Sequence, residues 1–359
     1  MIPHQTTDIT ADWLNERLGD QFGQIAAVQC EHIGEGVGIL GEVARLHLDY
    51  ADGQSGPATV IAKCQSLFPE NVGLSQMMGF YEREVNFYSQ LSDQLVMRVP
   101  ESFVAEVAPE GAPFVLVMEE VTGARMVDQL DGASKADTEA IVKTVAVLHA
   151  RFWNNDALRS LDWLPPMNND LYKGAGGLIE ANWDGFIEAW SDKLPAEAIA
   201  WSDQLKSRYV EMVDYCATWS PQTFAHTDVR ADNFLFGGSA GDGVVTVLDF
   251  QLCTRHVGVW DVANFLGASV TIEDRRAWQD DILAAYHGEL ERLGVTGYSL
   301  DELTFHYRMC SMHQAMAQIA VANLDPGNER GRALLDAMIT RSFTNALDNN
   351  GGELITYLP

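Results

Sequence analysis

The chain has 359 residues, of which 47% are hydrophobic, so it is long enough for two lobes with substantial apolar cores. Its 51 Asp and Glu residues outnumber its 23 Lys and Arg residues, and the formal net charge of −28 argues against nucleic acid as a partner. Five scattered cysteines without a Cys-x-x-Cys pair argue against a disulfide framework and a zinc site, and they favour a reducing compartment.

The first predicted elements are a short helix and a strand. Thr10 is a typical helix N-cap and Gly19 a typical helix end, so we expect a helix between them, followed by a strand over residues 27–33. The N-terminus has no basic segment followed by an apolar one, and no run of about 18 apolar residues occurs. We therefore expect a cytoplasmic protein without a membrane partner.

A glycine-rich segment follows the first strand. Gly36, Gly38, Gly41 and Val43 match the pattern Gly-x-Gly-x-x-Gly-x-Val. Apolar and polar residues then alternate up to Tyr50, which predicts a strand, whereas a dinucleotide-binding fold would need a helix there. We therefore predict the phosphate-covering hairpin of a kinase, with Val43 against adenine. The alternative is a flexible hairpin that binds nothing.

The third predicted strand, residues 59–63, ends in Lys63, the only lysine among the first 134 residues. A kinase needs one lysine here to hold the α- and β-phosphates, and a glutamate on the next helix to hold that lysine. Apolar residues from Met77 to Tyr88 recur at helical spacing and predict a buried stripe on a helix over residues 75–91. Glu84 falls on this inward face, so we expect it to pair with Lys63. The alternative is a stripe-edge Glu84 paired with a surface arginine.

Two further strands are predicted over residues 98–107 and 114–120. The second is almost entirely apolar, as a central strand should be, and it ends where a hinge to the next lobe is expected. Backbone groups from Glu119 to Val121 would then pair with adenine. Because the pattern turns helical after this point, we predict a nucleotide-binding lobe at residues 1–120 and a catalytic, substrate-binding lobe at residues 121–359.

The second lobe begins with an amphipathic helix over residues 134–153. His149 lies beside its apolar stripe, and we interpret it as a packed core histidine without a chemical role. Residues 154–185 contain several glycines, prolines and asparagines, which predicts a long irregular connection, a lid or a substrate loop.

The strongest motif comes next. His226 is followed by Asp228, Arg230 and Asn233, and Asp249 lies sixteen residues beyond Asn233, across a predicted β-hairpin. Phosphoryl transfer needs a carboxylate near the attacking hydroxyl and oxygen ligands for Mg²⁺, and this spacing fits the kinase template. We assign Asp228 as the base, Asn233 and Asp249 as Mg²⁺ ligands, and Arg230 as a contact of the γ-phosphate. The alternatives are an ordinary Asx-rich turn and a loop-bracing arginine.

The spacing after Asp249 separates two kinds of kinase. Only residues 252–258 lie between Asp249-Phe250-Gln251 and the next predicted helix, so there is no room for an activation loop that carries a peptide. Asp261, at the start of that helix, could cap the helix or brace the catalytic loop. A later helix, residues 303–323, carries a stripe of methionines that is mostly core, and the alternative is that these methionines line an apolar pocket.

These motifs resemble the aminoglycoside phosphotransferase and choline kinase superfamily, and most closely the ecdysteroid-kinase-like phosphotransferases. The matching segments are residues 84–88, 148–153, 226–233, 249–251 and 260–265. The resemblance implies an α+β, protein-kinase-like bilobal fold, with an antiparallel sheet plus one helix in the N-lobe and a mostly helical C-lobe. It also implies ATP, Mg²⁺ and a small hydroxylated acceptor in the helical lobe. Thr227 and Gln251 replace glycines of the family pattern, but neither change removes a catalytic group.

The first hypothesis is therefore an ATP- and Mg²⁺-dependent kinase for a hydroxyl of a small molecule. An aminoglycoside or choline would suit the negative charge, and a lipophilic alcohol would suit the Met and Trp content. A hydroxyacyl-CoA would need basic residues that the chain has in short supply. A non-catalytic nucleotide-binding scaffold is the alternative from another class, and it is opposed by the intact set Lys63, Glu84, Asp228, Asn233 and Asp249.

Overall fold

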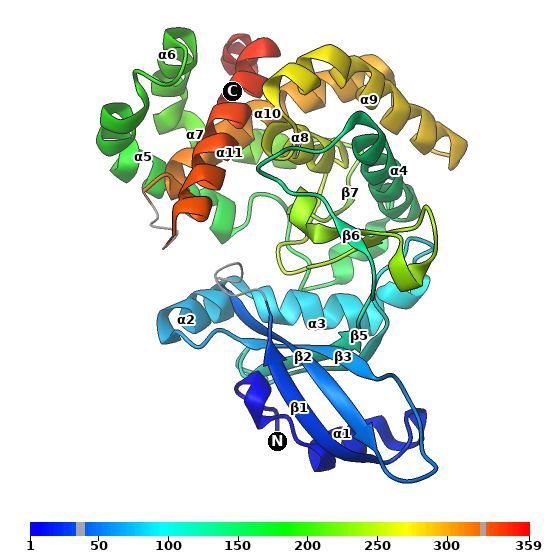
Figure 1. The fold of residues 1–359 in the computed structure, drawn as a ribbon. Helices are drawn as coiled ribbons and strands as arrows, with labels where there is room; N and C mark the ends of the chain where they lie inside the picture. Colours follow the sequence, from blue (N-terminus) through cyan, green and yellow to red (C-terminus); the bar gives the residue numbers. More distant parts are fainter. Residues whose placement is uncertain (34–39, 324–327) are drawn as a thin grey trace. The chain divides into compact units, whose positions relative to one another are not determined.

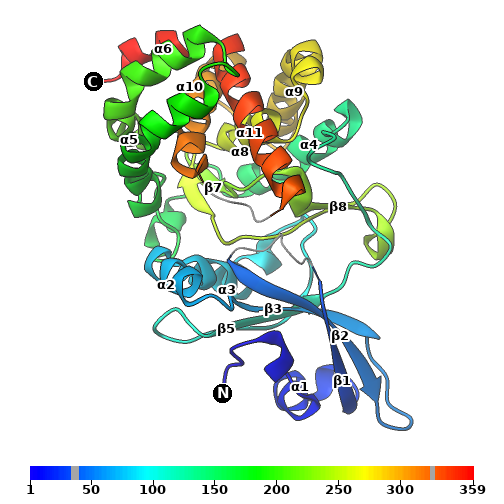
Figure 2. The ribbon, with the colours of Figure 1, turned by 60° about the vertical axis from the view of Figure 1, so that its left-hand side comes forward.

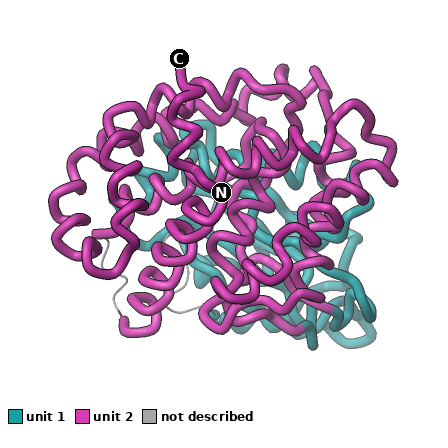
Figure 3. The backbone as a smooth tube through the Cα atoms, turned by 90° about the horizontal axis from the view of Figure 1, so that it is seen from above, with its two compact units in different colours: residues 1–124, 237–251 teal, residues 125–236, 252–359 magenta. Residues whose placement is uncertain are grey.

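A computed structural model describes residues 1–33, 40–323 and 328–359 (Figures 1 and 2). The chain divides into two units (Figure 3). Unit 1 is Met1–Ala124 with Gly237–Gln251, and unit 2 is Arg125–Phe236 with Leu252–Pro359. This division differs from the predicted one at residue 120, because residues 237–251 cluster with the N-terminal segment. Within unit 1, the Ser239 N–H donates to the Thr122 carbonyl at 2.8 Å and the Val247 N–H to the Arg98 carbonyl at 3.0 Å.

Unit 1 contains the predicted antiparallel sheet, with five strands in the order β1-β2-β3-β5-β4. The strands are β1 Ile25–His32, β2 Gly41–Tyr50, β3 Thr59–Gln65, β4 Ser102–Val107 and β5 Phe114–Glu119. Each of the five overlaps a predicted strand.

The two faces of this sheet pack against different helices. Helix α1, Ala11–Leu18, starts at Thr10 as predicted, and its leucines share a buried core with Ala62 and Cys64 of β3. Successive side chains of a strand point to opposite faces, so Lys63 faces away from α1. The other face carries α3, Phe80–Gln90 (Figures 1 and 2). Tyr81 of α3 stacks on Phe114 of β5 with ring centroids 4.2 Å apart. Lys63 is thereby directed to α3 by the strand period alone.

The predicted single helix over residues 75–91 is wrong in one respect. The chain forms α2, Pro69–Met78, and then α3, because Gly79 between them has a φ of +70°. A left-handed residue cannot continue a right-handed helix, and glycine adopts this conformation at little cost. Met77 is consequently 71% exposed and is not part of the buried stripe.

Unit 2 is mostly helical, as predicted. Its helices are α4 Lys135–Arg151, α5 Asp170–Trp190, α6 Ala196–Leu205, α7 Tyr209–Ala217, α8 Val259–Ala268, α9 Ile272–Arg292, α10 Leu300–Val321 and α11 Glu329–Asp348. Short strands accompany them: β6 Arg125–Met126 pairs with β8 Phe234–Phe236, and β7 Thr223–Ala225 pairs with β10 Thr254–His256. None of the helices in the described ranges combines the length and apolar character needed to cross a bilayer.

Helix α5 corrects the predicted irregular connection, because residues 170–185 are helical. The Asn169 side chain caps its N-terminus by accepting the Leu171 N–H at 2.9 Å. Gly176 is buried against α7, where a Cβ would lie 2.8 Å from Val210 Cγ2. Each interior glycine costs a helix about 1 kcal/mol, so tertiary packing overrides the local preference here.

The turn of the β-hairpin predicted between Asn233 and Asp249 is confirmed over residues 237–243. The Gly237 N–H donates to the Val244 carbonyl at 2.9 Å, ahead of β9, Val245–Val247. Gly238 has a φ of +66°, and a Cβ there would lie 2.4 Å from the Thr122 carbonyl oxygen. The close approach of these two backbone segments therefore requires glycine at 238.

Candidate active site

Unit 1 assembles a buried cluster of charges around Lys63. Lys63 Nζ lies 2.9 Å from Glu84 Oε2 and 3.4 Å from Asp249 Oδ1. Glu84 is only 1% exposed and Lys63 8%. The predicted Lys63–Glu84 pair is thus confirmed, and the alternative of a surface arginine for Glu84 is wrong. Asp249 joins the same cluster, although its sequence distance from Lys63 gave no sign of this contact.

Burial and neighbouring charges pull the ionisation of this cluster in opposite directions. Burial alone would lower the pKa of Lys63, but the carboxylates of Asp249 and Glu84 outweigh it and raise that pKa overall. Burial raises the pKa of Glu84 to about 7, against the opposing effect of Lys63. One cation thus faces two carboxyl groups, an excess of negative charge that suits a further cation.

Asp249 is held beside α3 by its neighbours in the chain. It has a φ of +63°, which is uncommon for a residue other than glycine. The next residue, Phe250, is fully buried and stacks on Phe87 of α3 with ring centroids 3.5 Å apart. Since β9 is also hydrogen-bonded to Arg98, residue 249 is fixed from both sides.

The predicted nucleotide-contacting residues of β2 lie next to Lys63. Val43 is paired directly with Lys63 across β2 and β3. A Cβ on Gly41 would lie 3.0 Å from the Cys64 carbonyl oxygen and 3.5 Å from Lys63 Cε. Gly36 and Gly38 lie outside the described residues, so their predicted role on the phosphates stays a prediction.

The predicted hinge residues are only partly available to a nucleotide. The N–H of Glu119 already donates to the Glu101 carbonyl at 2.8 Å, and its carboxylate forms an ion pair with Arg98. Val121 is 9% exposed. The backbone groups that could pair with adenine are therefore the Glu119 carbonyl and those of the following residues.

Unit 2 assembles the second predicted set of side chains. The amide nitrogen of Asn233 donates to Asp228 Oδ2 at 2.9 Å and to the Asp228 carbonyl at 2.8 Å. Because this nitrogen is occupied, the amide oxygen of Asn233 is the group left for a cation. Arg230 Nε lies 3.3 Å from Asp228 Oδ2, so Arg230 braces the loop, while its predicted contact with a γ-phosphate stays a prediction. The Asp228 side chain is 22% exposed, enough to reach a ligand.

Asp261 holds the backbone of this loop through two hydrogen bonds. Its Oδ2 accepts the His226 N–H and its Oδ1 the Thr227 N–H, both at 2.8 Å. Of the two predicted roles for Asp261, bracing the loop is the one observed. Thr227 has a φ of +64° in place of the expected glycine, a conformation that costs about 1–3 kcal/mol. Its hydroxyl donates to the Leu252 carbonyl at 2.6 Å, which helps to offset that cost.

Each unit contains an oxygen donor of the kind that Mg²⁺ prefers. These donors are the carboxylate of Asp249 in unit 1 and the amide oxygen of Asn233 in unit 2. No group of three or more His, Cys, Asp or Glu residues in the described part of the chain could hold a metal ion alone. Mg²⁺ commonly binds through one or two carboxylates plus substrate phosphates, so the residues present fit this mode rather than a protein-only cage.

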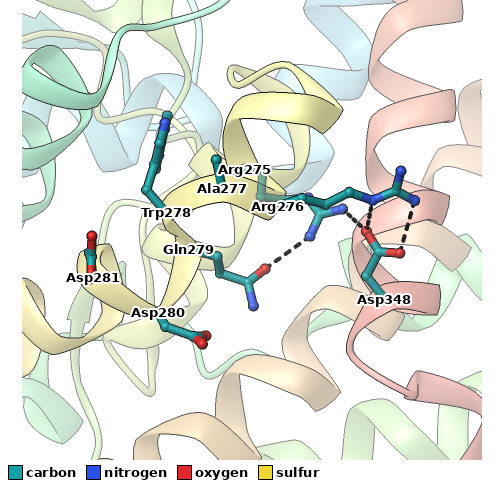
Figure 4. Close-up of a pocket in the computed structure, with 8 residues that line it drawn as sticks. All are labelled: Arg275, Arg276, Ala277, Trp278, Gln279, Asp280, Asp281 and Asp348. Carbon is teal, nitrogen blue, oxygen red and sulfur yellow. Dashed lines mark hydrogen bonds and ion pairs between the residues drawn. The ribbon is translucent and has the colours of Figure 1, made fainter.

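A surface pocket in unit 2 is not part of this set. It has a volume of about 430 Å³ and is lined by residues 275–281 of α9 and by Asp348 (Figure 4). Arg275 and Arg276 both point to Asp348 and form ion pairs with it. Since its arginines are already paired and none of the predicted site residues lines it, we assign no ligand to this pocket.

Comparisons with known proteins concern the family and the fold of the chain. The model of the ecdysteroid kinase-like family matches residues 35–296, more than half of the chain. No match is found among curated protein sequences. Three solved structures share the fold. One is a Ralstonia eutropha JMP134 protein provisionally assigned as an aminoglycoside phosphotransferase, with 18% identity, a TM-score of 0.56 and coverage of 97% of this chain and 98% of that one.

The second is choline kinase from Cryptosporidium parvum Iowa II, with 12% identity, a TM-score of 0.52 and coverage of 92% of this chain and 90% of that one. The third is the GDP complex of aminoglycoside 2'-phosphotransferase-IIIa, with 13% identity, a TM-score of 0.52 and coverage of 90% of this chain and 97% of that one. These likenesses confirm the predicted α+β, protein-kinase-like fold. The family match by itself shows that the chain belongs to the ecdysteroid kinase-like family.

Proposed function

We propose that this protein transfers the γ-phosphoryl group of ATP, with Mg²⁺, to a hydroxyl group of a small molecule. The observation that carries the proposal is the buried cluster of Lys63, Glu84 and Asp249 in unit 1. In this proposal unit 1 binds the nucleotide, and unit 2 supplies the base and binds the acceptor. Free cysteines throughout the chain support a reducing, cytoplasmic setting.

Each side chain then has one task. Lys63, oriented by Glu84, neutralises the α- and β-phosphates, and Asn233 and Asp249 would hold the metal ion. Mg²⁺, when bound, would neutralise negative charge on the transferred phosphoryl group and on the leaving oxygen. The glycine-rich segment with Gly36, Gly38 and Gly41 would also contact the phosphates. Val43 and the Glu119–Val121 backbone would contact adenine.

The transfer itself depends on Asp228. Its carboxylate accepts the proton of the acceptor hydroxyl while that oxygen forms a bond to the γ-phosphorus and the bond to the ADP oxygen breaks. Asn233 and Arg230, which both contact Asp228 Oδ2, hold the carboxylate in place for this step. Arg230 would also balance charge on the γ-phosphoryl group. Positioning and electrostatics supply most of the rate enhancement.

The acceptor class that we propose first is a lipophilic alcohol. The family that matches is named after ecdysteroid kinases, and the Met and Trp content of the chain suits an apolar acceptor. A cationic acceptor such as choline or an aminoglycoside is the second candidate, favoured by the net charge of −28. A hydroxyacyl-CoA ranks last, because only 23 Lys and Arg residues are present to meet its phosphates.

The test is nucleotide consumption with a panel of acceptors. ATP and GTP are each supplied with steroid alcohols, choline, ethanolamine and aminoglycosides, and ADP or GDP release is measured with and without Mg²⁺. Acceptor-dependent release that Asp228→Ala abolishes would support the proposal. ATP binding without acceptor-dependent release, or the same turnover in Asp228→Ala, would overturn it in favour of a nucleotide-binding scaffold.

A further inference from the structure

In unit 2, a continuous chain of hydrogen bonds ends at the backbone of the catalytic loop, residues 226–233. The Tyr286 hydroxyl lies 2.7 Å from His149 Nδ1, and His149 Nε2 lies 2.9 Å from Asp261 Oδ2. Asp261 in turn accepts the N–H groups of His226 and Thr227. The three side chains come from α9, α4 and α8, and each of them is fully buried. His149 is therefore more than the packed core histidine that the sequence predicted.

The partners of His149 determine which nitrogen carries its proton. A carboxylate can only accept hydrogen bonds, so Nε2 must be the donor to Asp261. The lone pair of Nδ1 then accepts the Tyr286 O–H, which fixes the tautomer and the orientation of the ring. In this arrangement Oδ2 of Asp261 accepts two hydrogen bonds at once, one from His149 and one from the loop backbone.

Gly258, the residue before α8, packs directly against the Tyr286–His149 contact. A Cβ at this position would lie 2.5 Å from the Tyr286 hydroxyl and 2.7 Å from His149 Nδ1. Any larger residue would therefore displace the Tyr286–His149 contact. The glycine lets the start of α8, which carries Asp261, lie directly on the pair.

The far end of the chain is the strained peptide next to the base. Thr227 is held at a φ of +64° by Asp261 on its N–H and by Asn264 on its carbonyl, at 3.1 Å. Asp228 follows immediately. If Asp261 rotated, the Thr227 peptide would relax toward a common backbone conformation, and the carboxylate of Asp228 would turn with it.

We propose that Tyr286 and His149 are positioning residues, which orient Asp261 so that the catalytic loop holds Asp228 in its reactive direction. This inference rests on the proposed role of Asp228 for its effect on turnover, but its structural part does not. The competing explanation is that the pair only stabilises the core of unit 2.

Substitutions of His149 by amides separate the two explanations. Glutamine places its amide nitrogen where Nε2 lies and so keeps a donor to Asp261, whereas asparagine reaches only the position of Nδ1 and loses that donor. We expect His149→Gln to lower kcat only several-fold, because it keeps the donor to Asp261 and loses the Nδ1 acceptor of the Tyr286 O–H. We expect His149→Asn to lower kcat about 10- to 100-fold, with the nucleotide KM unchanged, because a misplaced base slows the chemical step alone.

The chain offers a matched control for the tyrosine. The Tyr298 hydroxyl contacts His306 Nδ1 at 3.0 Å, and both residues are buried, so Tyr298→Phe removes the same kind of contact as Tyr286→Phe. We expect Tyr286→Phe to lower kcat several-fold and Tyr298→Phe to leave it unchanged, at similar losses of thermal midpoint. Equal effects on kcat would assign the pair to core stability and overturn the proposal.

Amide hydrogen exchange at residues 226–228 tests the structural part without any turnover. Faster exchange in His149→Asn than in His149→Gln, and in Tyr286→Phe than in Tyr298→Phe, would support the positioning role. Identical exchange in all four variants would overturn it. Because this measurement needs no acceptor, it decides the inference even if the proposed kinase activity proves wrong.

Discussion

The two sets of candidate site residues are held by different forces. In unit 1, Lys63 lies between two carboxylates in a buried setting, and Coulombic attraction across contacts of 2.9 and 3.4 Å orients the side chains. In unit 2, the partly exposed Asp228 contacts Arg230 at 3.3 Å, and the backbone of the two preceding residues is fixed by Asp261. The first region is organised by charge and the second by backbone geometry. Substitutions in the two should therefore change different observables.

The largest effect is expected at Asp228. Asp228→Asn keeps the shape and one acceptor oxygen but removes the proton acceptor, so kcat should fall about 10²- to 10⁴-fold. The nucleotide KM should stay close to the wild-type value, because the residues proposed to bind adenine and the α- and β-phosphates are in unit 1. Steady-state kinetics with varied ATP would measure both. A loss that appeared only in KM would contradict the division of labour between the two regions.

The next effect concerns the charges around Lys63. Lys63→Met leaves Glu84 and Asp249 without their cation, and breaking a buried ion pair in this way costs about 3–5 kcal/mol of unfolding free energy. The double variant Lys63→Met/Glu84→Gln should recover part of that loss, since one uncompensated carboxylate is removed. Urea unfolding would measure both.

The double variant also serves as the control for nucleotide binding. Both variants should bind ATP more weakly, because neither contains the lysine. A double variant that is less stable than Lys63→Met would contradict a charge-organised cluster. It would instead indicate that the Glu84 carboxylate contributes mainly through hydrogen bonds other than the one to Lys63.

The two units should also respond to pH with opposite sign. Burial raises the pKa of Glu84 in unit 1 to about 7, so between pH 4.5 and 7 the folded state holds a proton that the unfolded state has lost, and stability falls as pH rises. Burial lowers the pKa of His313 in unit 2 to about 3, so below pH 6.5 the unfolded state gains a proton first, and stability falls as pH falls. Each slope is roughly 1 kcal/mol per pH unit.

Two variants isolate these slopes. The difference in unfolding free energy between the wild type and Glu84→Gln should decrease from pH 4.5 to 7, and that between the wild type and His313→Phe should increase from pH 4.5 to 6.5. Denaturant titrations at four pH values would measure both differences. Curves parallel to the wild type would show that the residue does not carry the expected ionisation.

The smallest effect is expected at Thr227. Thr227→Gly relieves the left-handed strain, which is worth about 1–3 kcal/mol. It also removes the hydrogen bond from the Thr227 hydroxyl to the Leu252 carbonyl, and it increases the conformational entropy of the unfolded chain. The opposing terms should leave the unfolding free energy within about 1 kcal/mol of the wild type, and kcat within a few-fold, because Asp261 still holds the backbone. A large loss of kcat would mean that the Thr227 side chain itself orients the loop.

Much of unit 1 follows from residue periods. Alternation along β3 places Lys63 opposite Ala62 and Cys64, and the helical period of α3 places Glu84 inward, so their contact was predictable without coordinates. The break at Gly79 was missed, because helical periodicity alone does not register a single left-handed residue within an apolar pattern. The joining of Asp249 to the same cluster was missed for another reason, since no local pattern relates residue 249 to residue 63.

The order of motifs from His226 to Gln251, which spans both units, and the short connection before α8 predict the type of chemistry by themselves. The sequence predicts a loop at the glycine-rich start of α5, because helix propensity reflects only the local cost of glycine. It does not reflect the close packing against α7 that glycine permits. The contact between His149 and Asp261 spans 112 residues of sequence.

The sequence by itself therefore determined which residues carry the proposed chemistry and which elements bear them, because spacing along the chain specifies residue type, strand face and helix face. Only the tertiary structure decided what supports those residues: the cation shared with Asp249, and the Tyr286–His149–Asp261 chain beneath Thr227. Such contacts join side chains from separate elements. Their formation depends on how helices and strands pack in three dimensions, which no period of a single element encodes.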